Sequence, residues 1–235
     1  DGDGDYLTVP YSSDFVLDGD FTIECFVYFI SGSVMVDFTR YGSYANAWQL
    51  YNQTPTFYGY SSSGNAYMTS DTPLSRGWNH LVVTRTISDN TARMFINGVQ
   101  TASSTSFSHT YGNDTSNILM VGAQSYAGPQ AYFTGHISNL RIIKGTALYT
   151  SNFTPPTAPL TNVTNTVLLC CQSNTSATEA AVTPGSITAN GDAAATNFNP
   201  FNTDINTVRG QETGYATLNP LINGVANTLS DGNLT

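Results

Sequence analysis

Carboxylates stand at alternating positions in the first five residues, DGDGD. A D-x-D-x-D pattern opens the EF-hand calcium loop, which also needs Gly at its sixth position and a bidentate Glu at its twelfth. This chain has Tyr6 and Ser12 at those two positions, and no helix signal flanks the stretch. The stretch therefore predicts the lead-in to a β-strand at 6–10, and any calcium bound there would be shared with distant loops.

Calcium is the one cofactor that these residue types suggest, because it takes carboxylate, amide and backbone carbonyl oxygens. The candidate ligands near the predicted first strand are Asp3, Asp5 and Asp20. Further candidates in predicted loops are Asp89, Asn90, Asn113 and Asp114. Asp and Asn also favour turns by themselves, so a purely structural role stays open for all of them.

Aromatic side chains concentrate in two stretches, YGSYANAW at 41–48 and FYGYSSSGNAY at 57–67. An aromatic face can stack on the apolar face of a sugar ring, while Asn or Asp side chains bond the hydroxyls. The candidate sugar contacts are Tyr41, Tyr44, Trp48, Tyr58, Tyr60, Tyr67 and, from a third loop, Tyr126. Ordinary packing is the alternative, because Tyr is also favoured in strands.

The histidines and cysteines show no spacing that points to catalysis, metal binding or a disulfide framework. The three histidines lie far apart, and no Ser/His/Asp spacing points to nucleophilic catalysis. The three cysteines, Cys25, Cys170 and Cys171, lack a metal-binding spacing, and an odd count with a vicinal pair is a poor disulfide framework. We interpret them as small buried hydrophobes, which favours assembly in a reducing compartment.

Charge and hydropathy restrict the partners. The formal net charge is −9, and the seven Lys and Arg residues are scattered. A nucleic-acid-binding surface needs clustered basic residues, so we expect neither nucleic acid nor anionic membranes as partners. No apolar stretch approaches the roughly 20 residues of a membrane span.

Acidity with few lysines is typical of a secreted or particle-surface protein. From its start close to a strand and without Met, we expect a piece of a longer protein.

The elements that must position these residues are short strands. The predicted strands lie at 6–10, 21–29, 33–39, 48–52, 56–61, 79–86, 92–98, 117–123, 131–144 and 166–172. No run shows a helix-length 3.6-residue period, and the one helix candidate is a single turn at 145–150. Many short strands with regular turns predict an all-β fold, an antiparallel sandwich or barrel.

Two further signals are local. Asn97-Gly98, within 78–103, predicts a tight hairpin, because both central residues of a type I′ turn need positive φ. The stretch 151–165 is rich in proline and predicts a crossing loop.

Four motifs in order resemble laminin-G-like domains of the concanavalin A-like lectin/glucanase superfamily. DGDGDYLTVP is similar to the family's first strand, and FTIECFVYF to its F-T-I-E-x-W-V strand, with Phe26 where Trp is usual. GWNHLVVTRT followed by ARMFINGVQTA resembles the W-x-H-V-A-V-T-R … L-Y-V-D-G hairpin. NILMVGA and FTGHISNLRIIKGTALY resemble the closing stretch.

The resemblance implies a jelly roll: two antiparallel sheets face to face, with the N- and C-terminal strands adjacent. It assigns residues 1–201 to this domain, while 202–235 resemble a linker and the truncated start of a SPRY-like β module. It also implies that Trp78 belongs to the core and that His80 is structural.

Enzymatic activity is not expected. Glucanases of this superfamily carry paired carboxylates in an E-x-D-x-x-E pattern, and retaining chemistry needs two carboxyls roughly 5–5.5 Å apart. The chain has three glutamates and lacks that pattern, and Glu24 stands alone on its predicted strand. We therefore expect a non-enzymatic binding module.

The stretch 145–174 resembles laminin-G-like modules of virion structural proteins and tail fibres of tailed phages. This implies an adhesion module on the virion surface, assembled in the host cytoplasm, that contacts host envelope glycans and other virion proteins. Such fibres are usually trimeric, so a homo-oligomer is expected. The main alternative is a structural spacer or decoration domain with protein–protein contacts only. A cellular extracellular adhesion domain is a further alternative.

Overall fold

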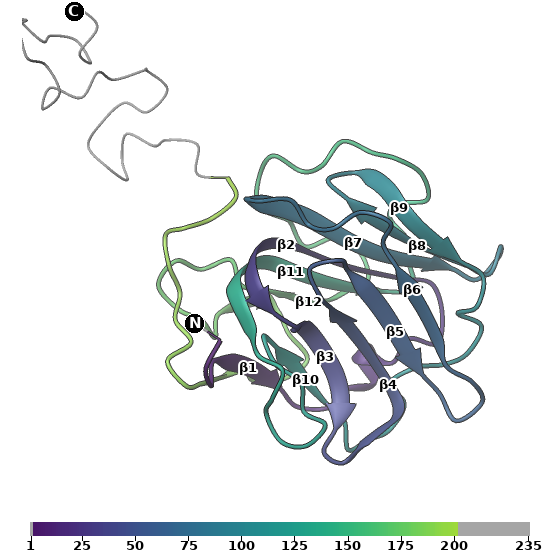
Figure 1. The fold of residues 1–235 in the computed structure, drawn as a ribbon, viewed down its shortest axis with the longest axis horizontal. Helices are drawn as coiled ribbons and strands as arrows, with labels where there is room; N and C mark the ends of the chain where they lie inside the picture. Colours follow the sequence, from purple (N-terminus) through teal and green to yellow (C-terminus); the bar gives the residue numbers. More distant parts are fainter. Residues whose placement is uncertain (1, 202–235) are drawn as a thin grey trace, which may run out of the picture. The chain divides into compact units, whose positions relative to one another are not determined.

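The structure, a computed structural model that describes residues 2–201, is an all-β sandwich, as predicted (Figure 1). Two seven-stranded antiparallel sheets of these residues pack face to face. The first sheet has the order β14 (Thr188–Asn190), β1 (Tyr6–Val9), β10 (Ile118–Val121), β3 (Val34–Arg40), β4 (Ser43–Tyr51), β5 (Thr56–Tyr60) and β6 (Ala66–Thr69). The second has the order β13 (Ala180–Val182), β12 (Thr166–Cys170), β11 (Phe133–Lys144), β2 (Phe21–Gly32), β7 (Trp78–Thr86), β8 (Thr91–Ile96) and β9 (Val99–Ser104).

The ends of the sandwich follow the expectation from the resemblance. β1 pairs with β14, with Tyr6 opposite Asn190, so the N- and C-terminal strands are adjacent. Residues 1–199 form one compact unit. The stretch 202–235, where a SPRY-like start is predicted, lies outside the described residues.

Local turn chemistry sets the hairpins. Asn97 and Gly98 have φ values of 52° and 79°, as the predicted type I′ turn between β8 and β9 requires. β6 was not predicted, because AYMT is short and leaves Tyr67 on the solvent side.

The helix predicted at 145–150 is wrong. The backbone of this segment instead bonds to side chains on the outer face of the second sheet. Thr22 Oγ1 donates to the Thr146 carbonyl and accepts from the Leu148 amide, both at 2.9 Å. Thr84 Oγ1 donates to the Tyr149 carbonyl, also at 2.9 Å. These hydrogen bonds engage the backbone carbonyls and the amide that a helical turn would pair with one another, so the segment forms no helix. The helical turn that the described residues do contain is a 3-10 turn, η1 (Ser13–Phe15).

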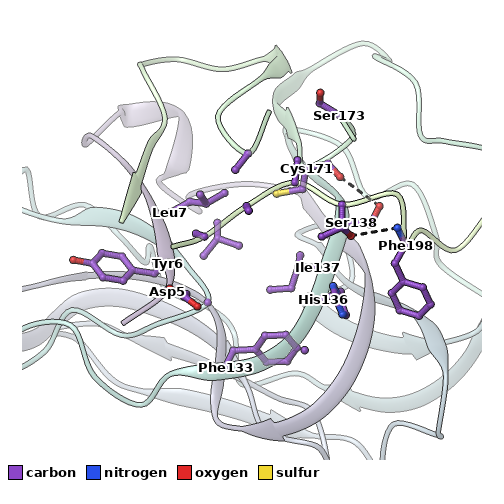
Figure 2. Close-up of a pocket in the computed structure, with 18 of the residues that line it drawn as sticks. Asp5, Tyr6, Leu7, Phe133, His136, Ile137, Ser138, Cys171, Ser173 and Phe198 are labelled. Carbon is purple, nitrogen blue, oxygen red and sulfur yellow. Dashed lines mark hydrogen bonds between the residues drawn. The ribbon is translucent and has the colours of Figure 1, made fainter. Parts of the chain in front are cut away.

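The chain after β12 closes one open side of the sandwich. Residues from 171–177 and 192–199 lie over β1 and the first half of β11. A cavity separates these two segments from the two strands (Figure 2). No helix of the described residues is long and apolar enough to cross a membrane.

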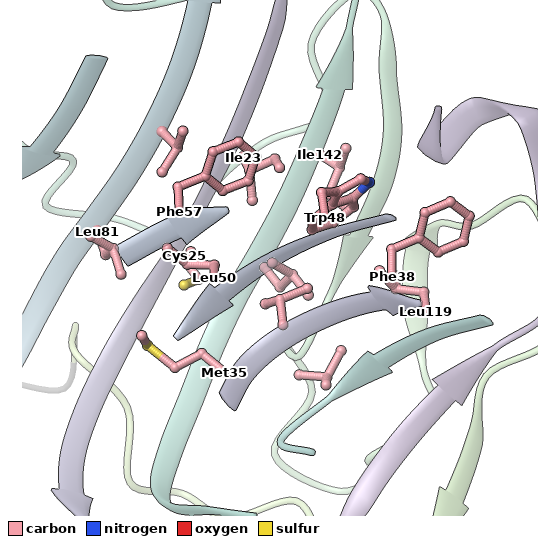
Figure 3. Close-up of a cluster of buried hydrophobic side chains, with 14 of the residues drawn as sticks. Ile23, Cys25, Met35, Phe38, Trp48, Leu50, Phe57, Leu81, Leu119 and Ile142 are labelled. Carbon is pink, nitrogen blue, oxygen red and sulfur yellow. The ribbon is translucent and has the colours of Figure 1, made fainter. Parts of the chain in front are cut away.

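The core lies between the sheets and takes large apolar side chains from both (Figure 3). Its fully buried members include Ile23, Cys25, Met35, Phe38, Trp48, Leu50, Phe57, Leu81, Leu119 and Ile142. Trp48 is anchored there, because its Nε1 donates to the Phe15 carbonyl at 2.8 Å.

The prediction that Trp78 belongs to the core is wrong. In the register of β2 and β7, Trp78 lies opposite Tyr28, on the same outward-facing side as Glu24 and His80. It is half-buried there against Tyr28 and His136, with ring centroids 5.8 and 6.2 Å away. Strand parity places this side chain outside the sandwich.

Candidate functional site

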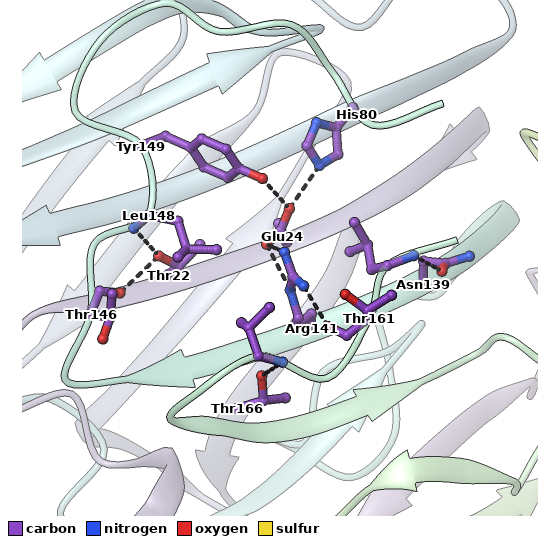
Figure 4. Close-up of polar contacts among 12 residues, drawn as sticks. Thr22, Glu24, His80, Asn139, Arg141, Thr146, Leu148, Tyr149, Thr161 and Thr166 are labelled. Atoms are coloured by element: carbon purple, nitrogen blue, oxygen red, sulfur yellow. Dashed lines mark hydrogen bonds and ion pairs between the residues drawn. The ribbon is translucent and has the colours of Figure 1, made fainter. Parts of the chain in front are cut away.

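A buried ionic cluster occupies the outer face of the second sheet (Figure 4). Arg141 donates to Glu24 Oε1 at 2.6 and 2.9 Å, and His80 Nε2 lies 3.0 Å from Oε2. The Tyr149 hydroxyl lies 3.4 Å from the same Oε2. Glu24 is fully buried. With both oxygens engaged and none reaching solvent, Glu24 serves the structure, and the expected structural role of His80 is confirmed.

The segment 145–165 covers this cluster. Phe153 stacks on Tyr149 at 3.8 Å and meets Phe95 and His80 edge-on at 5.5 and 5.8 Å. This face of the second sheet is therefore closed by the chain's own loop. The outer face of the first sheet, in contrast, carries tyrosines that reach solvent.

Five tyrosines form a continuous row across that face, which we call the tyrosine row. They come from three adjacent strands and one loop: Tyr126 from the loop after β10, Tyr44 from β4, Tyr60 and Tyr58 from β5, and Tyr67 from β6. In this order, successive ring centroids lie 4.0, 4.7, 4.0 and 6.0 Å apart, with interplanar angles of 6–23°. Residues two apart on one strand share a face, which is why Tyr58 and Tyr60 stack.

The ends of the row are open. Tyr67 is 67% exposed at one end. Near the other end, Tyr41 is 77% exposed, and the Gly42 amide donates to the Tyr126 carbonyl. The inner rings stack on one another, and the two rings with large exposed fractions are those of Tyr67 and Tyr41.

A buried carboxylate, which the sequence analysis did not single out, lies on the same face. Asp37 of β3 is fully buried and accepts from Gln49 Nε2 at 2.7 Å, from the Ser125 amide at 2.9 Å and from Thr39 Oγ1 at 2.5 Å. Burial raises the pKa of Asp37 to about 6, although these three hydrogen bonds oppose the shift. The signal in the sequence was a charged residue within the apolar run SVMVDFT.

Asp37 is linked to the tyrosine row through two neighbours. Gln49 Oε1 lies 3.4 Å from the Tyr60 hydroxyl, and Ser125 directly precedes Tyr126. Burial raises the pKa of both Tyr44 and Tyr60, so these hydroxyls stay protonated at neutral pH, and the Tyr60 hydroxyl donates to Gln49 Oε1.

The structure thus gathers most of the predicted sugar contacts. Tyr44, Tyr58, Tyr60, Tyr67 and Tyr126 form one row, and Tyr41 lies beside it. Trp48 is wrong as a sugar contact, because its side chain is fully buried in the core and cannot reach a ligand at the surface.

The candidate calcium ligands are not gathered. Asp5 accepts from the Asp192 amide at 2.8 Å, which holds the pKa of Asp5 below its usual value. Asp20 accepts from the Ile87 amide at 2.7 Å, in the other sheet, and Asp3 is exposed. In residues 2–201, no three His, Cys, Asp or Glu side chains are placed to hold a metal ion. Calcium binding through other oxygens stays a prediction.

The sequence profile of a family described as the concanavalin A-like lectin/glucanases superfamily matches residues 1–149. No protein of curated function matches the sequence. A candidate carbohydrate-binding protein from Bacteroides ovatus is similar in structure, with a TM-score of 0.56 at 16% identity over 82% of this chain and 59% of that chain. This likeness supports the fold.

Two other solved structures are more distant. The CBM40 domain of the Ruminococcus gnavus IT-sialidase, bound to α2,3 sialyllactose, has a TM-score of 0.49 at 16% identity, over 57% of this chain and 80% of that chain. Domains LG4-5 of the mouse laminin α1 chain have a TM-score of 0.48 at 17% identity, over 63% of this chain and 41% of that chain.

Proposed function

The chain belongs to the concanavalin A-like lectin/glucanase superfamily, and we propose that it is a non-enzymatic carbohydrate-binding module whose binding face is the tyrosine row. The observation that carries this proposal is the row itself. Five tyrosines from three strands and one loop align on the open face of the first sheet, while the loop 145–165 covers the other outer face.

The geometry suits an extended glycan. The free faces of Tyr41 and Tyr67 offer stacking positions for sugar rings near the two ends of the row. Between them, the tyrosine hydroxyls offer hydrogen bonds to sugar hydroxyls. A chain of several sugar units that lies along the row would use both kinds of contact.

Two buried carboxylates support binding without hydrolysis. Glycoside hydrolysis needs one carboxyl as acid and a second as nucleophile or base beside the scissile bond. Asp37 is buried beside the row, and its two carboxylate oxygens accept hydrogen bonds from Thr39, Gln49 and Ser125. Glu24 is enclosed on the second sheet.

We further propose that the module lies on a virion surface and contacts host envelope glycans, weakly at each site and strongly through many copies. The support is the resemblance of 145–174 to phage fibre modules. The competing proposal is a spacer or decoration domain that contacts virion proteins only. It is favoured by the low content of charged residues, 10%, which suits a packing surface.

The test is binding of the full chain to a glycan array and to host envelope polysaccharide, with Tyr67→Ala and Tyr41→Ala as variants. Each variant is expected to weaken binding about fivefold, since ring contacts contribute on the order of 1 kcal/mol. The matched controls Tyr67→Phe and Tyr41→Phe keep the ring and should keep most of the affinity. Equal binding by all four variants and the parent would reject the tyrosine row. Folded protein that binds no glycan would favour the spacer.

Parallel assays in calcium and in EDTA show whether calcium takes part in glycan binding.

A further inference from the structure

A second candidate site, drawn in Figure 2, lies against β1 and β11, whereas the strands of the tyrosine row are β4, β5 and β6. It is a cavity of about 400 Å³ between β1 and the first half of β11, roofed by the chain after β12. Its volume is within the range of roughly 300–1,000 Å³ that is usual for small-molecule pockets.

The floor of the cavity is apolar. Leu7 of β1, and Phe133 and Ile137 of β11, form it, and Figure 2 shows Phe133 and Ile137 on the same wall. The polar lining lies around this floor and includes Ser138, Ser173 and Thr196. An apolar floor with hydroxyls and amides around it matches a sugar ring, which has apolar C–H faces and a polar circumference.

The acidic residues that line the cavity favour an uncharged ligand over a negatively charged one. It contains the carboxyls of Asp5 and Asp192 and no Lys or Arg. Burial lowers the pKa of the one histidine, His136, which favours its neutral form. Asp5 and Asp192 also interact with each other, and the hydrogen bond with Asp5 raises the pKa of Asp192. A carboxylate-bearing sugar would meet repulsion from this acidic pair and no Lys or Arg, whereas an uncharged sugar can exchange hydrogen bonds with it.

The roof is fixed at both of its ends. The Asp192 amide donates to Asp5 Oδ1 at 2.8 Å. Phe198 packs on His136, Tyr28 and Trp78, with centroids 4.9, 5.0 and 5.3 Å away. The cavity is thus a built feature of the unit 1–199, held in shape by specific contacts.

Gly191 allows this closure. Its φ is 68°, and a Cβ there would lie 2.4 Å from the Gly4 carbonyl oxygen. Any other residue would push the start of the roof away from β1.

We propose that this cavity binds an uncharged, hydroxyl-rich molecule of monosaccharide size. It would sit with a ring face on Phe133 and Ile137 and with hydroxyls directed at Asp5, Asp192 and the roof. This site is separate from the tyrosine row, so it does not depend on the proposed glycan-binding face.

Cys171 provides a native reporter, because it lines the cavity and is half-buried. The other two thiols are enclosed: Cys25 is 0% and Cys170 1% exposed, and burial raises the pKa of Cys25. In the folded protein, alkylation should therefore begin at Cys171.

The experiment measures the rate of Cys171 alkylation by iodoacetamide, read by peptide mass spectrometry on the full chain. Glucose, galactose, N-acetylglucosamine and glucuronate are added separately at millimolar concentration. At least one neutral sugar should slow alkylation several-fold, and glucuronate should not. Failure of all three neutral sugars to protect Cys171, or equal protection by glucuronate, would overturn the proposal.

Variants locate the effect. Ile137→Trp fills the floor, and Ala195→Trp fills the cavity from the roof, where added bulk disturbs the core less. Either folded variant should lose the protection. Tyr67→Ala, which weakens the tyrosine row, should retain it. Protection that disappears with Tyr67→Ala would show that the sugar acts elsewhere, and the cavity would be rejected while the row would stand.

Discussion

Asp37 is a residue whose titration should couple folding to pH. Burial raises its pKa from 3.8 to about 6 in the folded protein. The folded state therefore holds this proton more tightly than the unfolded state, and the contribution of Asp37 to stability falls as pH rises from about 4 to about 6. The full change is roughly 3 kcal/mol, at about 1.4 kcal/mol for each pKa unit.

Urea unfolding of the parent and of Asp37→Asn, measured between about pH 4 and pH 7, isolates this contribution. The variant cannot titrate at this position, so the parent should lose stability relative to the variant as pH rises. A difference that is flat with pH would show that the three donors balance the penalty of burial, and a difference that changes in the opposite direction would show that they outweigh it.

The two tryptophans show what single residues reveal before a structure is known. Trp48 and Leu50 alternate with Gln49 and Tyr51, a period of two that already separates a core face from an outer face. Counting aromatics in a stretch ignored that alternation and led to the wrong prediction for Trp48. Trp78 could not be placed in this way, because the loop 145–165 and Phe198 cover the outer face and its residues look as apolar as the core.

The hairpin between β8 and β9 contacts the loop 145–165, and the contribution of this contact to stability can be tested at Gly98. Gly98 has φ 79°, and a Cβ there would lie 2.0 Å from the Phe153 carbonyl oxygen of the loop 145–165. Gly42, in the turn between β3 and β4, has a nearly equal φ of 76° and nothing within 4 Å. Gly42→Ala should cost about 1 kcal/mol of unfolding free energy from backbone strain alone.

Gly98→Ala should cost more than Gly42→Ala, because it must also displace the loop, whose Phe153 amide donates to the Gly98 carbonyl at 2.9 Å. Urea unfolding of both variants gives the comparison. Equal losses would mean that the loop yields freely and that its contact with the hairpin contributes little.

The ionic cluster on the second sheet connects β2, β7, β11 and the covering loop through Glu24. Glu24→Ala leaves the Arg141 guanidinium buried without its counter-charge, which should cost roughly 3–5 kcal/mol. The double variant Glu24→Leu with Arg141→Met removes both charges and should cost much less. Chemical denaturation compares the two. A double variant at least as unstable as the single one would show that the ion pair itself, and not the penalty of an unpaired charge, stabilises the sandwich.

At the scale of elements, the residues predicted most of the strands but contained no signal for the order of the strands within each sheet. Alternation and the Asn97-Gly98 turn act between near neighbours, so the hairpins could be derived from the residues alone. The tyrosine row depends on β4, β5, β6 and a loop some sixty residues further along meeting on one face. No spacing in the sequence connects these parts or reveals the burial of Asp37 beside them.

The whole molecule carries a net charge of −9, and this charge yields a prediction about salt. Anionic envelope polysaccharides should be repelled at long range, while the tyrosine row contacts uncharged groups at short range. Added salt shortens the Debye length, to about 10 Å at 0.1 M, and should speed association with an anionic polysaccharide without changing its dissociation rate. Association with a neutral polysaccharide should not change with salt. Surface plasmon resonance on immobilised polysaccharides of both kinds separates the two rates. Slower association with the anionic polysaccharide at high salt would mean that scattered arginines form an attractive patch, and that binding is electrostatic where we expect ring stacking and hydroxyl contacts.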